Sequence, residues 1–300
     1  MNGDVQSTAR QIPICRAVFG QTGLRSRISR AESGRFHRKK DMCVSDKLHH
    51  LGCYPEQLGR YVFLPGDPGR ASLIAKQLEH AERIAVQREF VTYTGTLDGV
   101  PVSVTSTGIG GPSAAIAMEE LSRSGAHTFV RVGTCGGIQE TLLPGTLIIP
   151  TAAIRKDGTA REYLPLSFPA AANFDLVLAL RSAAEKLGYP NRVGIVECKD
   201  SYYGQHDPES MPVCRELQEQ WQMWKRAGAL ASEMESSALF VVAAVRGARC
   251  ATVLLLVSNH ERSFAPGEPQ YSYEIDRAID TAVLAMRRQI AQDRTGDRVC

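Results

Sequence analysis

The sequence lacks the features that mark several large classes of proteins. No apolar run approaches the roughly 20 residues that a membrane-spanning helix needs, so the chain is not expected to cross a bilayer. The eight cysteines include no Cys-x-x-Cys pair and no Cys/His cluster with zinc spacing. Several cysteines lie inside apolar runs, as buried free thiols do, and this favours a reducing, cytoplasmic setting.

Basic charge is concentrated in the first 47 residues. They contain ten Lys or Arg against four Asp or Glu, which leaves 25 basic and 28 acidic residues for 48–300, although the whole chain carries a net charge of +3. A body with a slight excess of acidic residues gives no indication of nucleic-acid binding.

Residues 1–47 are predicted to be a disordered basic extension, and residues 48–300 a single domain. The extension is rich in Arg, Ser and Gly and has no sustained apolar period. A mis-assigned start, with Met42 as the true first residue, explains it best, because patterned sequence begins near Asp46. The alternative is an organellar transit peptide, which would place the protein in an organelle.

From residue 60 onward, apolar patterns predict alternating strands and helices. Asp98-Gly99 is a strong two-residue hairpin signal between two of the strands. The alternation predicts an α/β domain with a mixed, mainly parallel sheet that is curved, closed or barrel-like, and flanked by helices. Strands are expected at 61–64, 91–97, 100–106, 128–132, 146–151, 192–198 and 252–258, and helices at 69–80, 112–124, 174–188, 212–226, 233–247 and 271–291.

Three glycine-rich segments, at 65–70, 108–113 and 133–137, are expected to be turns after strands. Glycines at the carboxyl ends of strands let backbone amides approach an anion closely. None of the segments contains Gly-Lys, as a nucleotide-binding P-loop would, and none has the full Gly-x-Gly-x-x-Gly spacing of a dinucleotide site. Each segment alone is equally compatible with an ordinary structural turn.

Three arginines strengthen the case for an anion site. Arg70 follows the first glycine-rich segment, Arg88 lies in Gln-Arg-Glu-Phe, and Arg131 interrupts the apolar run Phe-Val-Arg-Val-Gly. A buried guanidinium is costly unless it meets an anion, and its fork suits phosphate oxygens. The alternative for Arg131 is an ion pair with a structural carboxylate.

Four segments together resemble the nucleoside phosphorylase superfamily over residues 48–290. They are Phe-Leu-Pro-Gly-Asp-Pro-Gly-Arg at 63–70, Ser-Thr-Gly-Ile-Gly-Gly-Pro-Ser at 106–113, Arg-Val-Gly-Thr at 131–134 and Glu-Met-Glu-Ser at 233–236. Within the superfamily the chain resembles the bacterial-type uridine phosphorylases. The resemblance implies phosphorolysis of uridine to uracil and ribose 1-phosphate, a transferase reaction of pyrimidine nucleoside salvage and catabolism.

The resemblance also implies which residues hold the substrates. The ribose would be bound by Glu235 through its 2′- and 3′-hydroxyls, by Met234 packing on the sugar, and by His50 of a neighbouring subunit at the 5′-hydroxyl. The residues implied in phosphate binding are Gly66, Arg70, Arg131 and Thr134, with Arg88 of the same neighbour.

A ring-shaped hexamer of three dimers is implied as well, because His50 and Arg88 must complete a neighbour's site. Glu89, Ile109 and Ser113 match positions that can hold a monovalent cation such as K⁺ between subunits. No other cofactor is expected. A solvated first helical turn remains the alternative reading of Glu-Met-Glu-Ser.

The stretch 199–208 is expected to recognise the base. Gln205 offers an acceptor and a donor side by side, which matches the N3–H and O2 edge of uracil, and Tyr202 can stack on the ring. The best-known uridine phosphorylases have an Arg two residues after this Gln, whereas this chain has Asp207. Lys199 and His206 resemble the residues that serve a second branch, where they donate to the departing base; the alternative is a strand-end Lys and a solvated His.

The main rival reading is a purine nucleoside or methylthioadenosine phosphorylase, or an AMP-cleaving enzyme, of the same superfamily. Related purine enzymes carry Ser-Asp-His where this chain has Ser258-Asn259-His260, and Asn is no general acid. A non-catalytic nucleoside-binding or storage protein is disfavoured because the arginines are retained. Only scattered glycines suggest a dinucleotide-dependent oxidoreductase.

Overall fold

The computed structural model describes residues 46–296. The expectation of a disordered extension at 1–47 therefore lies outside the described residues, apart from its last two positions. No helix between Asp46 and Gly296 has the length and apolar character needed to cross a membrane.

The strands form one sheet that closes on itself. Their order is β10-β6-β8-β9-β5-β1-β4-β3-β2, with β7 beside β6, and a further pairing of β10 with β5 closes a ring of β5, β10, β6, β8 and β9. The strands are β1 (Tyr61–Pro65), β2 (Glu79–Gln87), β3 (Phe90–Leu97), β4 (Val100–Thr105), β5 (Thr128–Gly137), β6 (Leu147–Arg155), β7 (Ala170–Ala171), β8 (Asn191–Cys198), β9 (Ala231–Glu233) and β10 (Arg249–Ser258). The predicted mixed, barrel-like sheet is confirmed.

Parallel and antiparallel pairings both occur along the sheet. β1 pairs in parallel with β4 and β5, β5 with β10, and β8 with β6 and β9. The pairs β2–β3, β3–β4, β5–β9, β6–β7 and β6–β10 are antiparallel. The sheet is therefore mixed, as expected. Five of these pairings within residues 46–296 are parallel and five are antiparallel, so it is not mainly parallel.

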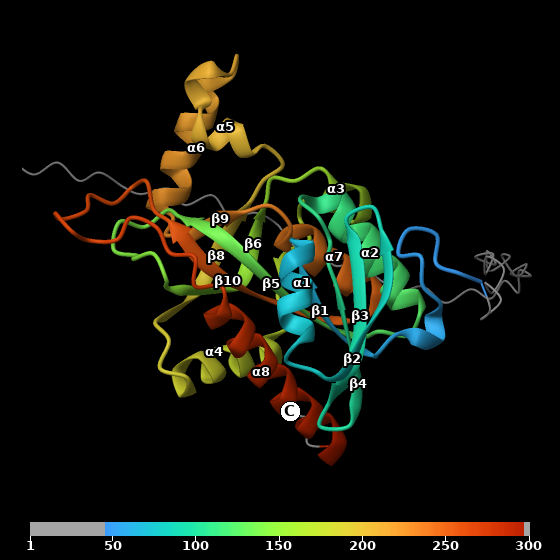
Figure 1. Cartoon of the computed structure of the whole chain (residues 1–300). Helices are drawn as coiled ribbons and strands as arrows, with labels where there is room; N and C mark the ends of the chain where they lie inside the picture. Colours follow the sequence, from blue (N-terminus) through green and yellow to red (C-terminus); the bar gives the residue numbers. More distant parts are fainter. Residues whose placement is uncertain (1–45, 297–300) are drawn as a thin grey trace, which may run out of the picture. The chain divides into compact units, whose positions relative to one another are not determined.

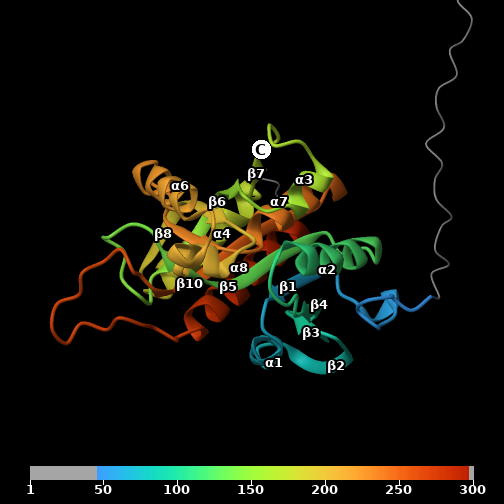
Figure 2. The ribbon, with the colours of Figure 1, turned by 90° about the horizontal axis from the view of Figure 1, so that it is seen from above.

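Helices cover both faces of the sheet (Figures 1 and 2). They are α1 (Pro68–Ala75), α2 (Gly111–Arg123), α3 (Thr159–Tyr163), α4 (Phe174–Lys186), α5 (Tyr202–His206), α6 (Cys214–Arg226), α7 (Ser236–Arg246) and α8 (Asp276–Thr295), with 3-10 turns at Pro55–Gln57 and Pro208–Ser210. α2 and α7 pack into one apolar core, and α1, α4 and α8 into the other. Strand β1 contributes Val62 to the first core and Phe63 to the second, as the two-residue period of a strand requires.

The Asp98-Gly99 hairpin is confirmed. Asp98 has φ 53° and Gly99 has φ 73°, so both central residues occupy the left-handed region that a tight two-residue turn needs. β3 and β4 pair around this turn from Leu97–Val100 to Thr92–Thr105.

Three local expectations were wrong. The segment 133–137 is not a turn, because β5 continues through Gly137 and pairs with β10 and β9. The helix expected at 69–80 ends at Ala75 and is followed by the polar strand β2. The helix expected from 233 begins at Ser236, because Ala231–Glu233 form β9.

Candidate active site

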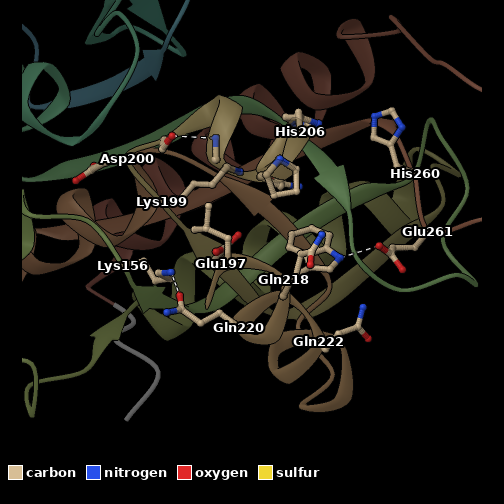
Figure 3. A pocket seen from close by; sticks show the side chains of 16 residues that line it. Lys156, Glu197, Lys199, Asp200, His206, Gln218, Gln220, Gln222, His260 and Glu261 are labelled. Carbon is tan, nitrogen blue, oxygen red and sulfur yellow. Dashed lines mark hydrogen bonds between the residues drawn. The ribbon is translucent and has the colours of Figure 1, made fainter. Parts of the chain in front are cut away.

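Two cavities adjoin at the carboxyl ends of β5, β8 and β9. The larger cavity has a volume of about 730 Å³ and is lined by Gly66, Arg70, Arg131, Thr134, Met234 and Glu235, among others. The side cavity, of about 570 Å³, is lined by Glu197, Gln205, Trp221 and His260 among others (Figure 3). Lys199 and His206 line both cavities and so mark their junction.

Arg131 is a buried cationic residue that lines the larger cavity. Its side chain is 5 % exposed, and it donates through Nη2 to Glu235 and lies with Nε 3.4 Å from Glu233 Oε2. Within residues 46–296, Nη1 has no hydrogen-bond partner, and Nε has none beyond its ionic contact with Glu233. The structural carboxylate that the sequence left as an alternative is therefore present, but the guanidinium retains donors for an anion.

Glu233 and Glu235 have different roles. Glu233 is fully buried and accepts hydrogen bonds from the backbone N–H of Glu235 at 3.0 Å and of Ser236 at 2.9 Å, so it satisfies the start of α7. Glu235 accepts from Gly110 N at 2.6 Å and faces Arg131. Burial raises the pKa of the Glu235 carboxyl, while Arg131 opposes this rise. The reading of this segment as a solvated helical turn is wrong.

The glycine turns bring the backbone close to Arg131. A Cβ at Gly66 would lie 3.1 Å from the carbonyl oxygen of Gly108, and one at Gly133 would lie 2.9 Å from Arg131 Nη2. Arg70 donates through Nη1 to Val132 O at 3.1 Å, and burial together with the nearby charge of Arg131 lowers its pKa. Two guanidinium groups thus face one cavity next to a turn in which a Cβ at Gly66 would crowd the backbone of Gly108.

Lys199 lies at the junction of the cavities with its charge buried. It is 8 % exposed and its ammonium donates to Ser232 Oγ. Ser232 Oγ also lies 2.6 Å from Glu197 Oε2 and 2.9 Å from Gln205 Oε1. Burial lowers the pKa of Lys199, and the carboxylate of Glu197 opposes this shift. Figure 3 shows Lys199 and Glu197 next to each other, with His260 and Glu261 on another side of the cavity.

His206 stands between two aromatic rings. Its ring centroid is 4.2 Å from that of Tyr202 and 5.5 Å from that of His260. Burial, with the charges of Lys199 and His260, lowers the pKa of His206 and favours the neutral imidazole. Tyr202 is 53 % exposed and lines the larger cavity.

Not every expected residue lines the cavity of Arg131. Gln205 lines the side cavity, which adjoins the cavity of Arg131. His50 and Arg88 line neither cavity: His50 Nδ1 lies 2.7 Å from Glu120 Oε1, and Arg88 is exposed with φ 55°. The two are held near each other, because Gln87 Nε2 donates to His49 O at 2.7 Å.

The residues expected at a cation site lie close to the larger cavity. Ser113 Oγ donates to Glu89 Oε1 at 2.6 Å, and this hydrogen bond lowers the pKa of Glu89. Glu89 and Ile109 line the cavity, and Ile109 is 78 % exposed. Within Asp46–Gly296, no group of three or more His, Cys, Asp or Glu side chains is arranged to hold a metal ion.

Sequence reasoning missed three buried polar residues. Glu120 accepts hydrogen bonds from the backbone of His50 and Leu51. Ser232 contacts Lys199, Gln205 and Glu197 through its hydroxyl. The sequence did contain a signal for Glu120 and Glu197, because each is a carboxylate at a position where the local pattern is apolar. It contained none for Ser232.

Comparison with known proteins agrees with this geometry. A model described as the phosphorylase superfamily matches residues 60–291. The chain belongs to the phosphorylase superfamily. It is 48 % identical over 249 residues to a uridine phosphorylase of Treponema pallidum, covering 83 % of this chain and 96 % of the relative. A uridine phosphorylase of Thermococcus kodakarensis is 43 % identical, covering 70 % and 77 %, and a guanosine phosphorylase of Halorubrum lacusprofundi is 34 % identical, covering 80 % and 95 %.

Proposed function

We propose that the protein cleaves uridine with inorganic phosphate, giving uracil and ribose 1-phosphate. The observation that carries this proposal is the buried Arg131. Its Nη1 has no partner within residues 46–296, and the residue shares a cavity with Arg70 and Glu235. One cavity therefore contains cationic donors for an anion and a carboxylate for a diol. The relatives named as uridine phosphorylases share this chain over most of its length.

The reaction needs few moving groups. A phosphate oxygen attacks C1′ of the ribose while the C1′–N1 bond breaks, and the bonding electrons leave with the base. Arg70, Arg131, Thr134 and the Gly66 turn hold the phosphate, and the 2′- and 3′-hydroxyls donate to Glu235. Because charge develops on both the sugar and the base, fixed charges near each end lower the barrier.

The departing base lies against Lys199 and His206. Lys199 keeps two ammonium hydrogens beyond the one given to Ser232, and it can donate to the carbonyl oxygen that becomes negative. His206 is neutral at pH 7 because its pKa is lowered, so it can donate through one ring nitrogen only. Lys199 is therefore the stronger electrostatic partner of the leaving group, with Tyr202 stacking on the ring.

The active unit is a homo-oligomer, a hexamer of three dimers in which His50 and Arg88 complete the site of a neighbour. Their absence from the cavity of their own chain, together with the exposure of Arg88, supports this arrangement. Variants Arg88→Ala, in a donated residue, and Glu235→Ala, in the receiving chain, should each have little activity. Mixing them with subunit exchange should restore part of the activity, because one site of each mixed dimer then has both residues. No recovery in the exchanged mixture would refute the shared site.

A monovalent cation at Glu89, Ile109 and Ser113 would stabilise the dimer. Glu89 and Ser113 carry oxygen atoms, the ligands that a hard cation prefers, and their hydrogen bond keeps them together. We place the reaction in the cytoplasm, because Cys53, Cys135, Cys198, Cys214 and Cys250 are free thiols.

The first test is ultraviolet absorbance during incubation with uridine, with and without phosphate, beside inosine, guanosine and adenosine. Cleavage of uridine that requires phosphate is expected. Cleavage of the purine nucleosides alone would replace uridine by the purine substrates of the superfamily. Absence of any cleavage, with nucleoside still bound, would point to a binding protein.

A further inference from the structure

The hydroxyl of Ser232 lies among three polar groups in a buried position. Lys199, Glu197 and Ser232 are 8 %, 5 % and 3 % exposed. The ammonium of Lys199 donates to Ser232 Oγ, and the same oxygen lies 2.6 Å from Glu197 Oε2 and 2.9 Å from Gln205 Oε1. Ser232 thus connects a buried lysine and a buried carboxylate to the side chain that we expect to read the base.

Ser232 has a single proton to donate, and two oxygens are within reach of it. The charged carboxylate of Glu197 is both the nearer and the stronger acceptor, so it takes the proton. The oxygen of Ser232 is then left with lone pairs only. Opposite Gln205 Oε1, it would form a contact between two oxygens with no hydrogen between them. A half-turn of the amide removes this conflict, because Gln205 Nε2 then donates to Ser232 Oγ.

The orientation of the amide determines whether Oε1 or Nε2 of Gln205 faces the base. With Nε2 on Ser232, Oε1 is directed away from Ser232 and can accept a hydrogen bond. Uracil carries N–H at ring position 3, whereas cytosine has a bare nitrogen there. We propose that Glu197, acting through Ser232, fixes the Gln205 amide with its oxygen toward the base and so selects uracil over cytosine. This inference rests on the proposed function and names a positioning residue for it.

The charge of Glu197 is the element that holds this orientation. In Glu197→Gln, a neutral amide competes with Gln205 for the Ser232 proton on nearly equal terms, so both orientations of Gln205 are populated. In Glu197→Met no acceptor remains at this position, and the proton goes to Gln205 Oε1. The base then meets Nε2–H, which suits cytosine and leaves uracil N3–H facing another donor.

The test is calorimetric binding of uracil and of cytosine to the full chain in phosphate buffer, for the wild type and the variants. The wild type should bind uracil more tightly. We expect Glu197→Gln to reduce the ratio of the two affinities on the order of tenfold, and Glu197→Met to reduce it further, because an unmatched buried hydrogen bond is at stake. The ratio does not depend on the folded fraction of the sample, since both bases are measured on the same preparation.

The matched control is Glu119→Gln, the same change at a buried carboxylate that pairs with Arg246 and lines neither cavity. It should leave the ratio unchanged. An unchanged ratio in both Glu197 variants would overturn the inference, as would a wild type that binds the two bases equally. Failure of the proposed function would instead be seen as a wild type that does not cleave uridine with phosphate.

Discussion

Inorganic phosphate should stabilise this protein strongly, and Arg70 should be required for the effect. Arg70 and Arg131 face the same cavity, and the charge of Arg131 contributes to the lowered pKa of Arg70. Nη1 of Arg131 is buried and has no partner among the described residues 46–296. An anion placed between the two guanidinium groups satisfies the free donors and removes the repulsion, so it binds the folded state alone.

The size of the effect follows from binding linkage. Phosphate at 100 times its dissociation constant adds about 2.7 kcal/mol to the free energy of unfolding. For a domain of this size each kcal/mol raises Tm by about 2–4 °C, so an increase of about 5–11 °C is expected. Differential scanning calorimetry, with chloride at matched ionic strength as the reference, measures it.

The matched pair of variants is Arg70→Met and Arg181→Met. Arg181 is an exposed arginine that pairs only with Glu185 on its own helix. Arg70→Met should lose the phosphate-dependent increase and keep a normal Tm in chloride, because it also loses the repulsion from Arg131; Arg181→Met should keep the full increase. A full increase in Arg70→Met, or none in the wild type, would refute the assignment of this cavity to phosphate.

Three further predictions concern single carboxylates and one lysine. Glu235→Gln should lower kcat/KM for uridine by about 10- to 150-fold in steady-state assays, because a charged hydrogen bond to the ribose is lost, and 2′-deoxyuridine should suffer less. Burial lowers the pKa of Lys199, so kcat/KM should fall as the pH rises through a value below 10.5, and Lys199→Met should lack this decline. Hydrogen bonds from Arg249 and Tyr61 lower the pKa of Asp293 to about 2, although burial alone would raise it. The contribution of Asp293 to the free energy of unfolding is therefore complete above pH 3.8, its ordinary pKa, and is lost as the pH falls through 2. Asp293→Asn should therefore lower the free energy of unfolding by about 1–2 kcal/mol at pH 7, measured by urea titration, with the difference vanishing near pH 2.

Local sequence predicted those elements whose stability is decided locally. The Asp98-Gly99 turn and the apolar strand β1 were found because turn chemistry and a continuous apolar run leave few other conformations. β2 was missed for the opposite reason. Its sequence, Glu-His-Ala-Glu-Arg-Ile-Ala-Val-Gln, is polar, and it is a strand only because it pairs with β3 at the edge of the sheet.

Glycine misled the prediction of β5. Gly133, Gly136 and Gly137 read locally as a turn, yet they continue the strand. At Gly133 and Gly137, side chains occupy the space where a Cβ would be. Leu254 Cδ2 lies 2.8 Å from the Cβ position of Gly133, and Asn259 Nδ2 lies 2.8 Å from that of Gly137. Contacts between residues more than a hundred positions apart cannot be read from a local pattern.

Only those residues of the site that belong to recognisable sequence motifs could be predicted. Arg131, Glu235 and the Gly66 turn meet as the resemblance implied. Glu197 and Ser232 belong to no motif, and their importance comes from where β8 and β9 place them beside Lys199. A role that depends on which of two acceptors takes one proton requires the distances themselves.

Asn259 offers a last test of how far position can be read as function. Its side chain does not line either cavity; Nδ2 donates to the carbonyl oxygens of Gln139 and Leu142, each at 2.9 Å, and Oδ1 accepts from Glu261 N at 3.1 Å. An aspartate here would direct a carboxylate oxygen at two carbonyl oxygens. Asn259→Asp should therefore lower the free energy of unfolding by about 2–4 kcal/mol, seen as a lower Tm, without gaining activity on inosine or guanosine. Efficient purine cleavage by this variant would show that residue 259 can turn into the cavity, and that the missing acid, rather than the shape of the site, keeps purines from being cleaved.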